Sequence, residues 1–196
     1  MSLLVELSKI SKLQDAFIKQ WKQHDKQSSL TTEGFLHLVE QNHAFNYALW
    51  QAEDRARRED KGHEFVYLAK REIDSLNQQR NNMIEAMDCF LFETLHPSDD
   101  KACPVHSETP GMMIDRLSIL ALKAYHMYLQ TERKEVDEAH RKSCLEKWHI
   151  LLAQQKQLML CLTEFSAEVK AKTRTFKLYY QFKMYNDRRL NPELYG

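Results

Sequence analysis

Polar side chains recur on one face of the segment 43–58, HAFNYALWQAEDRARR, and an aromatic ring lies among them. At about 100° per residue of α-helix, one face carries six such side chains. They are His43, Asn46, Trp50, Glu53, Asp54 and Arg57. A carboxylate and an imidazole on one face can serve as general base and proton partner, which makes Glu53 and His43 candidate catalytic residues. The mixture predicts one wall of a partly closed polar pocket, where Asn46, Trp50 and Glu53 would recognise a polar ring.

The same residues also have a purely structural interpretation. Glu53 with Arg57, and Asp54 with Arg58, are acid-first pairs four residues apart, and each pair stabilises a helix by about 0.3–0.5 kcal/mol. From residue 43 to residue 57 a helix spans about 21 Å, so one small ligand cannot touch the whole face. If the face is functional, it divides into a His43, Asn46 and Trp50 end and a Glu53, Asp54 and Arg57 end, of which only one need be chemical.

Charged residues also interrupt the apolar pattern of two other predicted helices. Arg80 falls in the apolar stripe of 64–95, while Asp115 and Arg116 lie in 112–129, which is apolar almost all round. An unpaired buried guanidinium costs several kcal/mol, so Arg80 needs an acidic side chain from another helix or a bound anion. The pattern further predicts that Asp115 and Arg116 share one side of their helix with Lys123 and His126.

Two interpretations of these charges stay open. In the first, Asp115 and Arg116 form a buried ion-pair network with Arg80 or Glu53 that fixes the helix register. In the second, Arg80, Arg116 and Lys123 surround an anion such as a phosphate, and Asp115 or Glu53 orients them.

The C-terminal segment mixes rings with basic side chains. Residues 170–189 contain seven basic residues, one acid and five aromatics, a pattern that can bind single-stranded nucleic acid. We favour a structural interpretation, in which Leu178, Phe182 and Tyr185 share one face and dock on the bundle. Lys183 would then reach over the pocket.

Metal binding is an alternative that the helical spacing argues against. Two Glu-x-x-His pairs, Glu40 with His43 and Glu146 with His149, are typical of di-iron helical bundles. We expect Glu40 on the solvent side of its helix and the second pair away from the apolar stripe, so no metal and no cofactor is predicted. The sequence also contains no P-loop, dinucleotide-binding or nucleophile-elbow motif.

Composition sets the class of protein. The chain has 196 residues with only four glycines and four prolines, which predicts an all-α fold of one domain. Basic and acidic residues balance at 28 each, so no net charge recruits nucleic acid or an anionic membrane. The N-terminus has no continuous apolar run, and the four cysteines are far apart. We therefore expect a cytoplasmic protein with reduced thiols and no membrane insertion.

Helical periodicity predicts a bundle of about five long helices plus a C-terminal helical segment within a domain covering 1–196. The expected elements are 3–22, 32–60, 64–95, 110–129, 135–172 and a tail over 174–196. The loop at 96–109 is either disordered or a lid. Thr109 and Pro110 should begin the fourth helix, which is either the central helix or part of a homodimer interface.

Three segments together resemble the bacterial domain of unknown function 4254 family. They are N-x-x-L-W-x-x-E-D-x-A-R at 46–57, T-P-G-M-M-I-D-R-L-S-I-L at 109–120 and Q-F-K-M-Y-N-D-x-x-L-N-P at 181–192. The resemblance covers nearly the whole chain after about residue 30. It singles out Asn46, Trp50, Glu53, Asp54, Arg57, Asp115, Arg116, Lys183, Asn186 and Asp187. It implies a setting near genes for cell-envelope glycan and lipopolysaccharide assembly, without an assigned activity.

Three functional hypotheses follow. The preferred one is a binding or accessory protein with a polar interior pocket for an anionic ligand, such as a sugar phosphate or nucleotide sugar. Arg80, Arg116, Lys123 and Lys183 would then hold the anion. The second is an enzyme at the same pocket, with Glu53 or Asp115 as general base and His43 as proton partner. The third is a scaffold for a protein partner, in which the charges form only a structural network.

Overall fold

The computed structural model describes residues 6–23, 31, 33–182 and 189–195, and its fold is all-α. Its elements are α2 (Ile10–Gln23), α3 (Gly34–Ala56), the 3-10 turn η1 (Glu59–Lys61), α4 (His63–Leu95), α5 (Pro110–Thr131), α6 (Glu138–Lys170) and the short α7 (Pro192–Tyr195). Within the described ranges the only β pairing is an isolated bridge between Val105 and Thr175. The predicted long helices are therefore confirmed.

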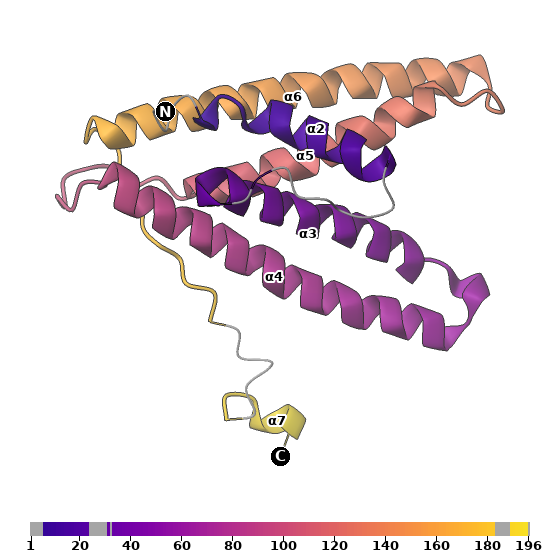
Figure 1. Cartoon of the computed structure of the whole chain (residues 1–196), viewed down its shortest axis with the longest axis horizontal. Helices are drawn as coiled ribbons and strands as arrows, with labels where there is room; N and C mark the ends of the chain where they lie inside the picture. The colour runs from indigo at the N-terminus through magenta and orange to yellow at the C-terminus, as the bar shows by residue number, and fades with distance from the viewer. Residues whose placement is uncertain (1–5, 24–30, 32, 183–188, 196) are drawn as a thin grey trace.

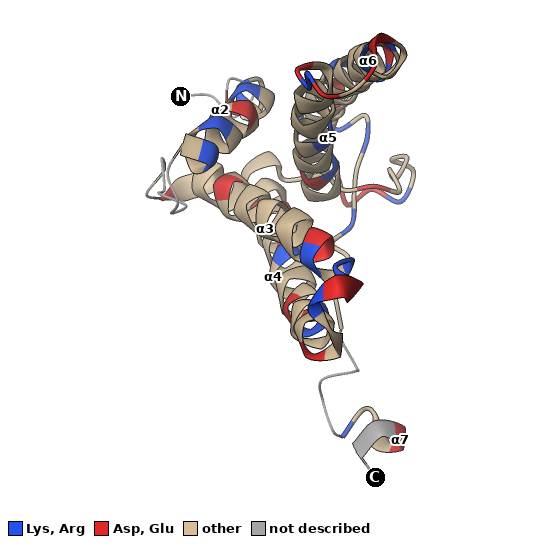
Figure 2. Cartoon of the chain, turned by 90° about the vertical axis from the view of Figure 1, so that its right-hand side faces the viewer, with Lys and Arg blue, Asp and Glu red and all other residues tan. Residues whose placement is uncertain are grey.

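Two helical hairpins make up most of the structure (Figure 1). One is α3 with α4, the other is α5 with α6, and the end-on view separates the two pairs, with α2 beside them (Figure 2). Helix α5 contacts α2, α3, α4 and α6, and this explains why its sequence is apolar almost all round. The central position predicted for this helix is confirmed.

The start of α5 is fixed against α4 by Asp88. The Thr109 hydroxyl caps the helix by accepting from the Met112 amide at 3.2 Å, and Pro110 occupies the first turn. Asp88 Oδ2 accepts from the Thr109 hydroxyl at 2.5 Å, and Oδ1 accepts from the Gly111 amide at 2.6 Å. A Cβ added at Gly111 would lie 2.6 Å from Asp88 Oδ1 and 2.7 Å from the Ile84 carbonyl oxygen, so this approach requires glycine.

Three apolar clusters hold the helices together. The largest contains buried residues of α2, α3, α4, α5 and α6, together with Phe176 from the segment after α6. A second cluster, around Phe17, Trp21 and Tyr47, lies between α2, α3 and α5. The third joins α3 to α4 through small side chains such as Ala52 and Ala69, which allow the two helices to approach closely.

The loop at 96–109 is neither disordered nor a lid over the polar face of α3. Its backbone pairs with the segment after α6, where the His106 amide donates to the Thr175 carbonyl oxygen at 2.7 Å and the Thr175 amide donates to the Pro104 carbonyl oxygen at 3.0 Å. The Thr175 hydroxyl also donates to the Ser98 carbonyl oxygen at 2.8 Å. These bonds anchor the loop beside the C-terminal end of α6.

The predicted helical tail over 174–196 is wrong for the described residues 174–182. Helix α6 ends at Lys170, Lys172 adopts a left-handed φ of 61°, and the chain then runs without helix as far as residue 182. Phe176 is fully buried, but Phe182 is 85% exposed and does not dock on the bundle. The backbone bonds to the loop at 96–109 replace those a helix would have made, and only Pro192–Tyr195 is helical in the described part of the tail.

The candidate residues Lys183, Tyr185, Asn186 and Asp187 lie outside the described residues. In the part of the chain that the structure describes, none of the helices combines the length and apolar character that a bilayer span requires.

Candidate functional site

The buried charge predicted opposite Arg80 is Asp115. Arg80 Nε donates to Asp115 Oδ1 at 2.8 Å, and Nη2 donates to Oδ2 at 2.6 Å, a bidentate ion pair between α4 and α5. The Asp115 side chain is 4% exposed and that of Arg80 is 26% exposed. The pair raises the pKa of Arg80, chiefly through the hydrogen bonds to Asp115. The sequence predicted that Arg80 needs an acidic side chain from another helix or a bound anion, and Asp115 of α5 is that acidic side chain.

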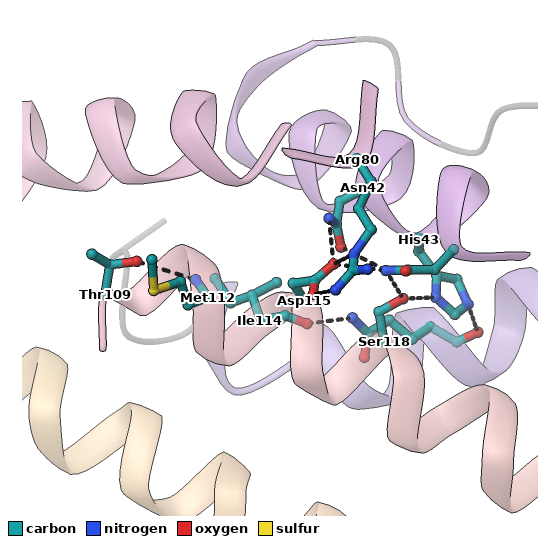
Figure 3. A network of polar contacts seen from close by, with 10 residues as sticks. Asn42, His43, Arg80, Thr109, Met112, Ile114, Asp115 and Ser118 are labelled. Atoms are coloured by element: carbon teal, nitrogen blue, oxygen red, sulfur yellow. Dashed lines mark hydrogen bonds and ion pairs between the residues drawn. The ribbon is translucent and has the colours of Figure 1, made fainter. Parts of the chain in front are cut away.

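Two amides of α3 complete the shell of Asp115 (Figure 3). Asn42 Nδ2 and Asn46 Nδ2 donate to Asp115 Oδ1 at 3.0 and 2.9 Å, so this oxygen accepts three hydrogen bonds, including that from Arg80. Asn46 Nδ2 also lies 2.9 Å from Ser118 Oγ. A carboxylate whose oxygens already accept this many hydrogen bonds from the protein suits a structural anchor better than a general base.

His43 closes the buried end of this network. Its Nε2 lies 3.0 Å from the Gln14 carbonyl oxygen, and its Nδ1 lies 2.7 Å from Ser118 Oγ. A neutral ring satisfies both contacts, because Nε2–H donates to the carbonyl while Nδ1 accepts from the hydroxyl. Burial lowers the pKa of His43 to about 3, partly offset by the bond to Gln14. His43 is fully buried and is absent from the lining of the cavity described below, so its predicted role as a proton partner is not supported.

A cavity of about 400 Å³ lies between α3, α4 and α5, and it adjoins this network at Asn46 and Arg80. Its lining mixes amide, charged, aromatic and aliphatic side chains. They are Asn46, Leu49, Trp50, Glu53, Asp54, Arg57, Asn77, Arg80, Ile119 and Leu122. The size falls within the range of small-molecule sites. The structure thus brings together five of the six residues of the polar face of 43–58 and adds Arg80 to them; only His43 is left outside.

The floor and one wall of the cavity are rigidly held. Arg80 uses Nε and Nη2 on Asp115, while its Nη1 has no hydrogen-bond partner within the described residues. Trp50 stacks on His126 with ring centroids 4.3 Å apart and an angle of 7° between the planes. Burial lowers the pKa of His126, and the positive charge of Lys22 lowers it further. The cavity therefore combines a fixed indole with a guanidinium that retains donor capacity.

The rim of the cavity carries an exposed ion pair. Arg57 Nη1 donates to Glu53 Oε2 at 2.8 Å, and the two side chains are 69% and 39% exposed. Asp54 is exposed beside them. Only this end of the polar face has charged groups that both reach solvent and line the cavity.

Arg116 and Lys123 do not join Arg80. Arg116 is 54% exposed and pairs with Glu108, its Nη1 lying 2.6 Å from Oε1, and Lys123 is also exposed. The predicted common side of α5 is wrong because Arg116 is rotated about 100° from Asp115. The residues of α5 that share the inward side with Asp115 follow it by three, four, seven and eleven positions. They are Ser118, which bonds to the network, Ile119 and Leu122, which line the cavity, and His126, which stacks on Trp50.

Asn42, Ser118 and Gln14 belong to the network and were not predicted from the sequence. Helical spacing points to the first two, since Asn42 precedes Asn46 by four residues and Ser118 follows Asp115 by three. Gln14 accepts from His43 through its backbone carbonyl, which no pattern of side chains could have indicated, and its side-chain amide donates to the Ile114 carbonyl oxygen at 3.4 Å.

Glu40 is buried, contrary to the expectation that it faces solvent. It is 1% exposed and accepts from the Thr31 amide at 2.9 Å and from the Thr31 hydroxyl. These bonds tie the segment before α3 to the helix. Across the described ranges no three His, Cys, Asp or Glu side chains are grouped as metal ligands.

These observations define an all-helical protein in which a buried ion pair underlies a polar cavity between two hairpins. The chain belongs to the family described as "Protein of unknown function (DUF4254)", whose model matches residues 36–178. That span contains α4, α5 and α6, all of α3 except its first two residues, and every residue lining the cavity. No curated protein and no solved structure matches the sequence.

Proposed function

We propose that the cavity between α3, α4 and α5 binds a small anionic ligand that contains a polar ring, such as a sugar phosphate or a nucleotide sugar. The observation that carries this proposal is the state of Arg80. Asp115 holds the guanidinium through Nε and Nη2, and Nη1 stands without a partner in the described residues at the wall of a 400 Å³ cavity. A fixed guanidinium with unused donors is suited to a phosphate or carboxylate.

The other lining residues support a ring. Trp50 is held by its stack on His126, Asn77 offers an amide, and Glu53 offers a carboxylate for hydroxyl groups. Rigid aromatic rings with a few convergent polar groups are typical of small-molecule sites. The resemblance to a family found near envelope-glycan genes makes sugar phosphates and nucleotide sugars the first compounds to test. A cytoplasmic binding or accessory protein is the role that we propose.

The alternative of an enzyme now depends on Glu53. His43 lies in the core, and the Asp115 carboxylate accepts hydrogen bonds from Arg80, Asn42 and Asn46. Of the candidate bases, Glu53 is the one that lines the cavity and reaches solvent. An enzyme would lose turnover in Glu53→Gln while keeping ligand affinity, whereas a binding protein has no turnover to lose.

A thermal-shift screen tests the proposal. The probes are glucose 6-phosphate, uridine diphosphate glucose, glucose and inorganic phosphate, each measured on wild type, Arg80→Lys and Arg116→Ala. A ligand at 100 times its Kd adds about 2.7 kcal/mol to the free energy of unfolding. We expect a sugar phosphate or nucleotide sugar to raise the Tm of wild type and of Arg116→Ala equally.

Arg80→Lys keeps a positive charge but loses the bidentate geometry and the spare Nη1 donors. We expect its affinity for the same compound, measured by calorimetry, to fall at least tenfold. The proposal is wrong if no compound shifts the wild-type Tm, or if Arg80→Lys binds as tightly as wild type. In that case a protein partner becomes the better hypothesis.

A further inference from the structure

A second cavity, of about 420 Å³, lies between α2, α5 and α6. It shares no lining residue with the first. Ile119 of the first cavity and Tyr128 of the second are nine positions apart on α5, which places them about 180° apart around the helix. Its walls are Asp15, Ile18 and Lys19 of α2, Ala124, Tyr125 and Tyr128 of α5, and Trp148 and Leu152 of α6.

Three aromatic rings converge on this cavity. The rings of Tyr128 and Trp148 have centroids 5.3 Å apart and an angle of 47° between their planes, so they form two adjacent walls rather than a closed stack. Tyr125 adds a third ring, whose neighbour His126 lies edge-on at 5.5 Å. Tyr128 is 40% exposed, so the aromatic surface is accessible from solvent. Aromatic faces carry partial negative charge and attract ammonium groups.

Asp15 places a carboxylate beside these rings. Burial raises the pKa of Asp15, while the Gln155 amide and the positive charge of Lys19 lower it in part. Lys19 follows one helical turn later and lines the same cavity, yet among the described residues no direct ion pair joins it to Asp15. The cavity therefore presents an incompletely compensated carboxylate next to aromatic faces, with a separate cation at its edge.

We propose that this second cavity binds a compact zwitterion, with its ammonium group against Tyr128, Trp148 and Asp15 and its anionic group beside Lys19. A bare organic cation would be attracted by the rings and by Asp15 but repelled by Lys19. A bare anion would meet Asp15 and three negative ring faces. Only a ligand with both charges matches all of the lining groups. The proposal does not depend on the ligand of the first cavity.

Glycine betaine is the probe, because it carries a trimethylammonium group and a carboxylate. Tetramethylammonium and acetate each supply one half of it. We expect calorimetry with the intact protein to give at least tenfold tighter binding of glycine betaine than of either half. Asp15→Asn and Trp148→Leu should each weaken betaine binding at least tenfold, since each removes one part of the ammonium site.

Lys19→Gln separates the two halves of the site. It should weaken betaine several-fold while leaving tetramethylammonium binding unchanged or tighter, whereas Lys12→Gln, a lysine of α2 that lines neither cavity, should change nothing. If Trp148→Leu melts early, Trp148→Phe keeps an aromatic face and should bind betaine within a few-fold of wild type. The proposal is overturned if wild type does not bind betaine, if acetate binds as well as betaine, or if Asp15→Asn binds unchanged.

Discussion

The polar face of α3 has two ends that look alike in sequence and differ in structure. At the N-terminal end, His43 and Asn46 bond to Ser118, Gln14 and Asp115 inside the protein. At the C-terminal end, Glu53, Asp54 and Arg57 line an open cavity, and their charges reach solvent. Polar residues on an inward face thus stabilise the fold where protein atoms fill their hydrogen-bonding capacity. Where some of that capacity faces a cavity, the same kind of residue is available to a ligand.

Arg80 lies at the boundary between the two ends. Its Nε and Nη2 belong to the buried network, and the residue also lines the cavity. The comparison predicts that changes on the buried side reduce stability, and that changes on the cavity side reduce affinity.

The largest effect should come from Asp115→Ala. The substitution leaves the Arg80 guanidinium, Asn42 and Asn46 without their shared acceptor. Removing one partner of a buried pair costs about 3–5 kcal/mol, and because Arg80 is partly exposed we expect the lower end of that range. Urea unfolding followed by circular dichroism measures the change. A loss below about 1 kcal/mol would mean that the network does not support the fold.

His43→Gln should change the pH dependence of stability. The pKa of His43 is about 3 in the folded protein against 6.5 for the unconstrained group, so the unfolded state takes up the proton first on acidification. The contribution of neutral His43 is fully present above pH 6.5 and is lost as the pH falls toward 3, by up to about 1.4 kcal/mol per pH unit. Wild type should therefore lose more stability than His43→Gln between neutral and acidic pH. Equal slopes would contradict a neutral, buried His43.

Asp88 provides a second test of pH dependence, in which acidification should raise the contribution of the residue to stability instead of lowering it. Burial raises its pKa from 3.8 to about 6, although the bonds from Thr109 and Gly111 lower it in part. The folded protein therefore takes up this proton first, and stability rises as the pH falls from 6 toward 3.8. Asp88→Asn removes this compensation, so its unfolding free energy should fall more steeply with acid than that of wild type. A shallower slope would overturn this assignment.

Much of this arrangement could be predicted from the sequence. Apolar periodicity and the Thr109 and Pro110 pair predicted the long helices. The intrusion of Arg80 into an apolar stripe predicted either an acidic partner on another helix or a bound anion, and Asp115 is the acidic partner. Periodicity gives the face of a residue only to within one position, and so Arg116 was grouped with Asp115. The prediction of helix over 174–182 was wrong because the path of this segment depends on bonds to the distant loop at 96–109, which local sequence does not encode.

Arg116→Ala should have a small effect on stability. If Arg116 were buried, its loss would cost several kcal/mol, but it forms a pair with Glu108 in which the side chains are 54% and 38% exposed. Exposed pairs contribute about 0.2–1 kcal/mol, less in high salt. Thermal unfolding at low and high ionic strength would check this. A loss of several kcal/mol would place Arg116 in the structural network after all.

Glu53→Gln should have the smallest effect on stability and a clear effect on the cavity. Its pair with Arg57 is an exposed bond across one helical turn, worth about 0.3–0.5 kcal/mol. The same change alters a side chain that lines the cavity, so the affinity for a sugar phosphate should change by more than the stability does. If Glu53→Gln changed the stability but not the affinity, the Glu53 and Arg57 pair would have a structural role only.

The most direct test is a nuclear magnetic resonance titration that follows the indole N–H signals of the three tryptophans. Trp21 lies in the core, Trp50 lines the first cavity and Trp148 lines the second, so each indole reports on a different place. On addition of glucose 6-phosphate or uridine diphosphate glucose, we predict that the Trp50 signal shifts in wild type while those of Trp21 and Trp148 stay fixed, and that Arg80→Lys weakens the response at least tenfold. A Trp50 signal that stays fixed with both compounds would contradict a ligand site in this cavity.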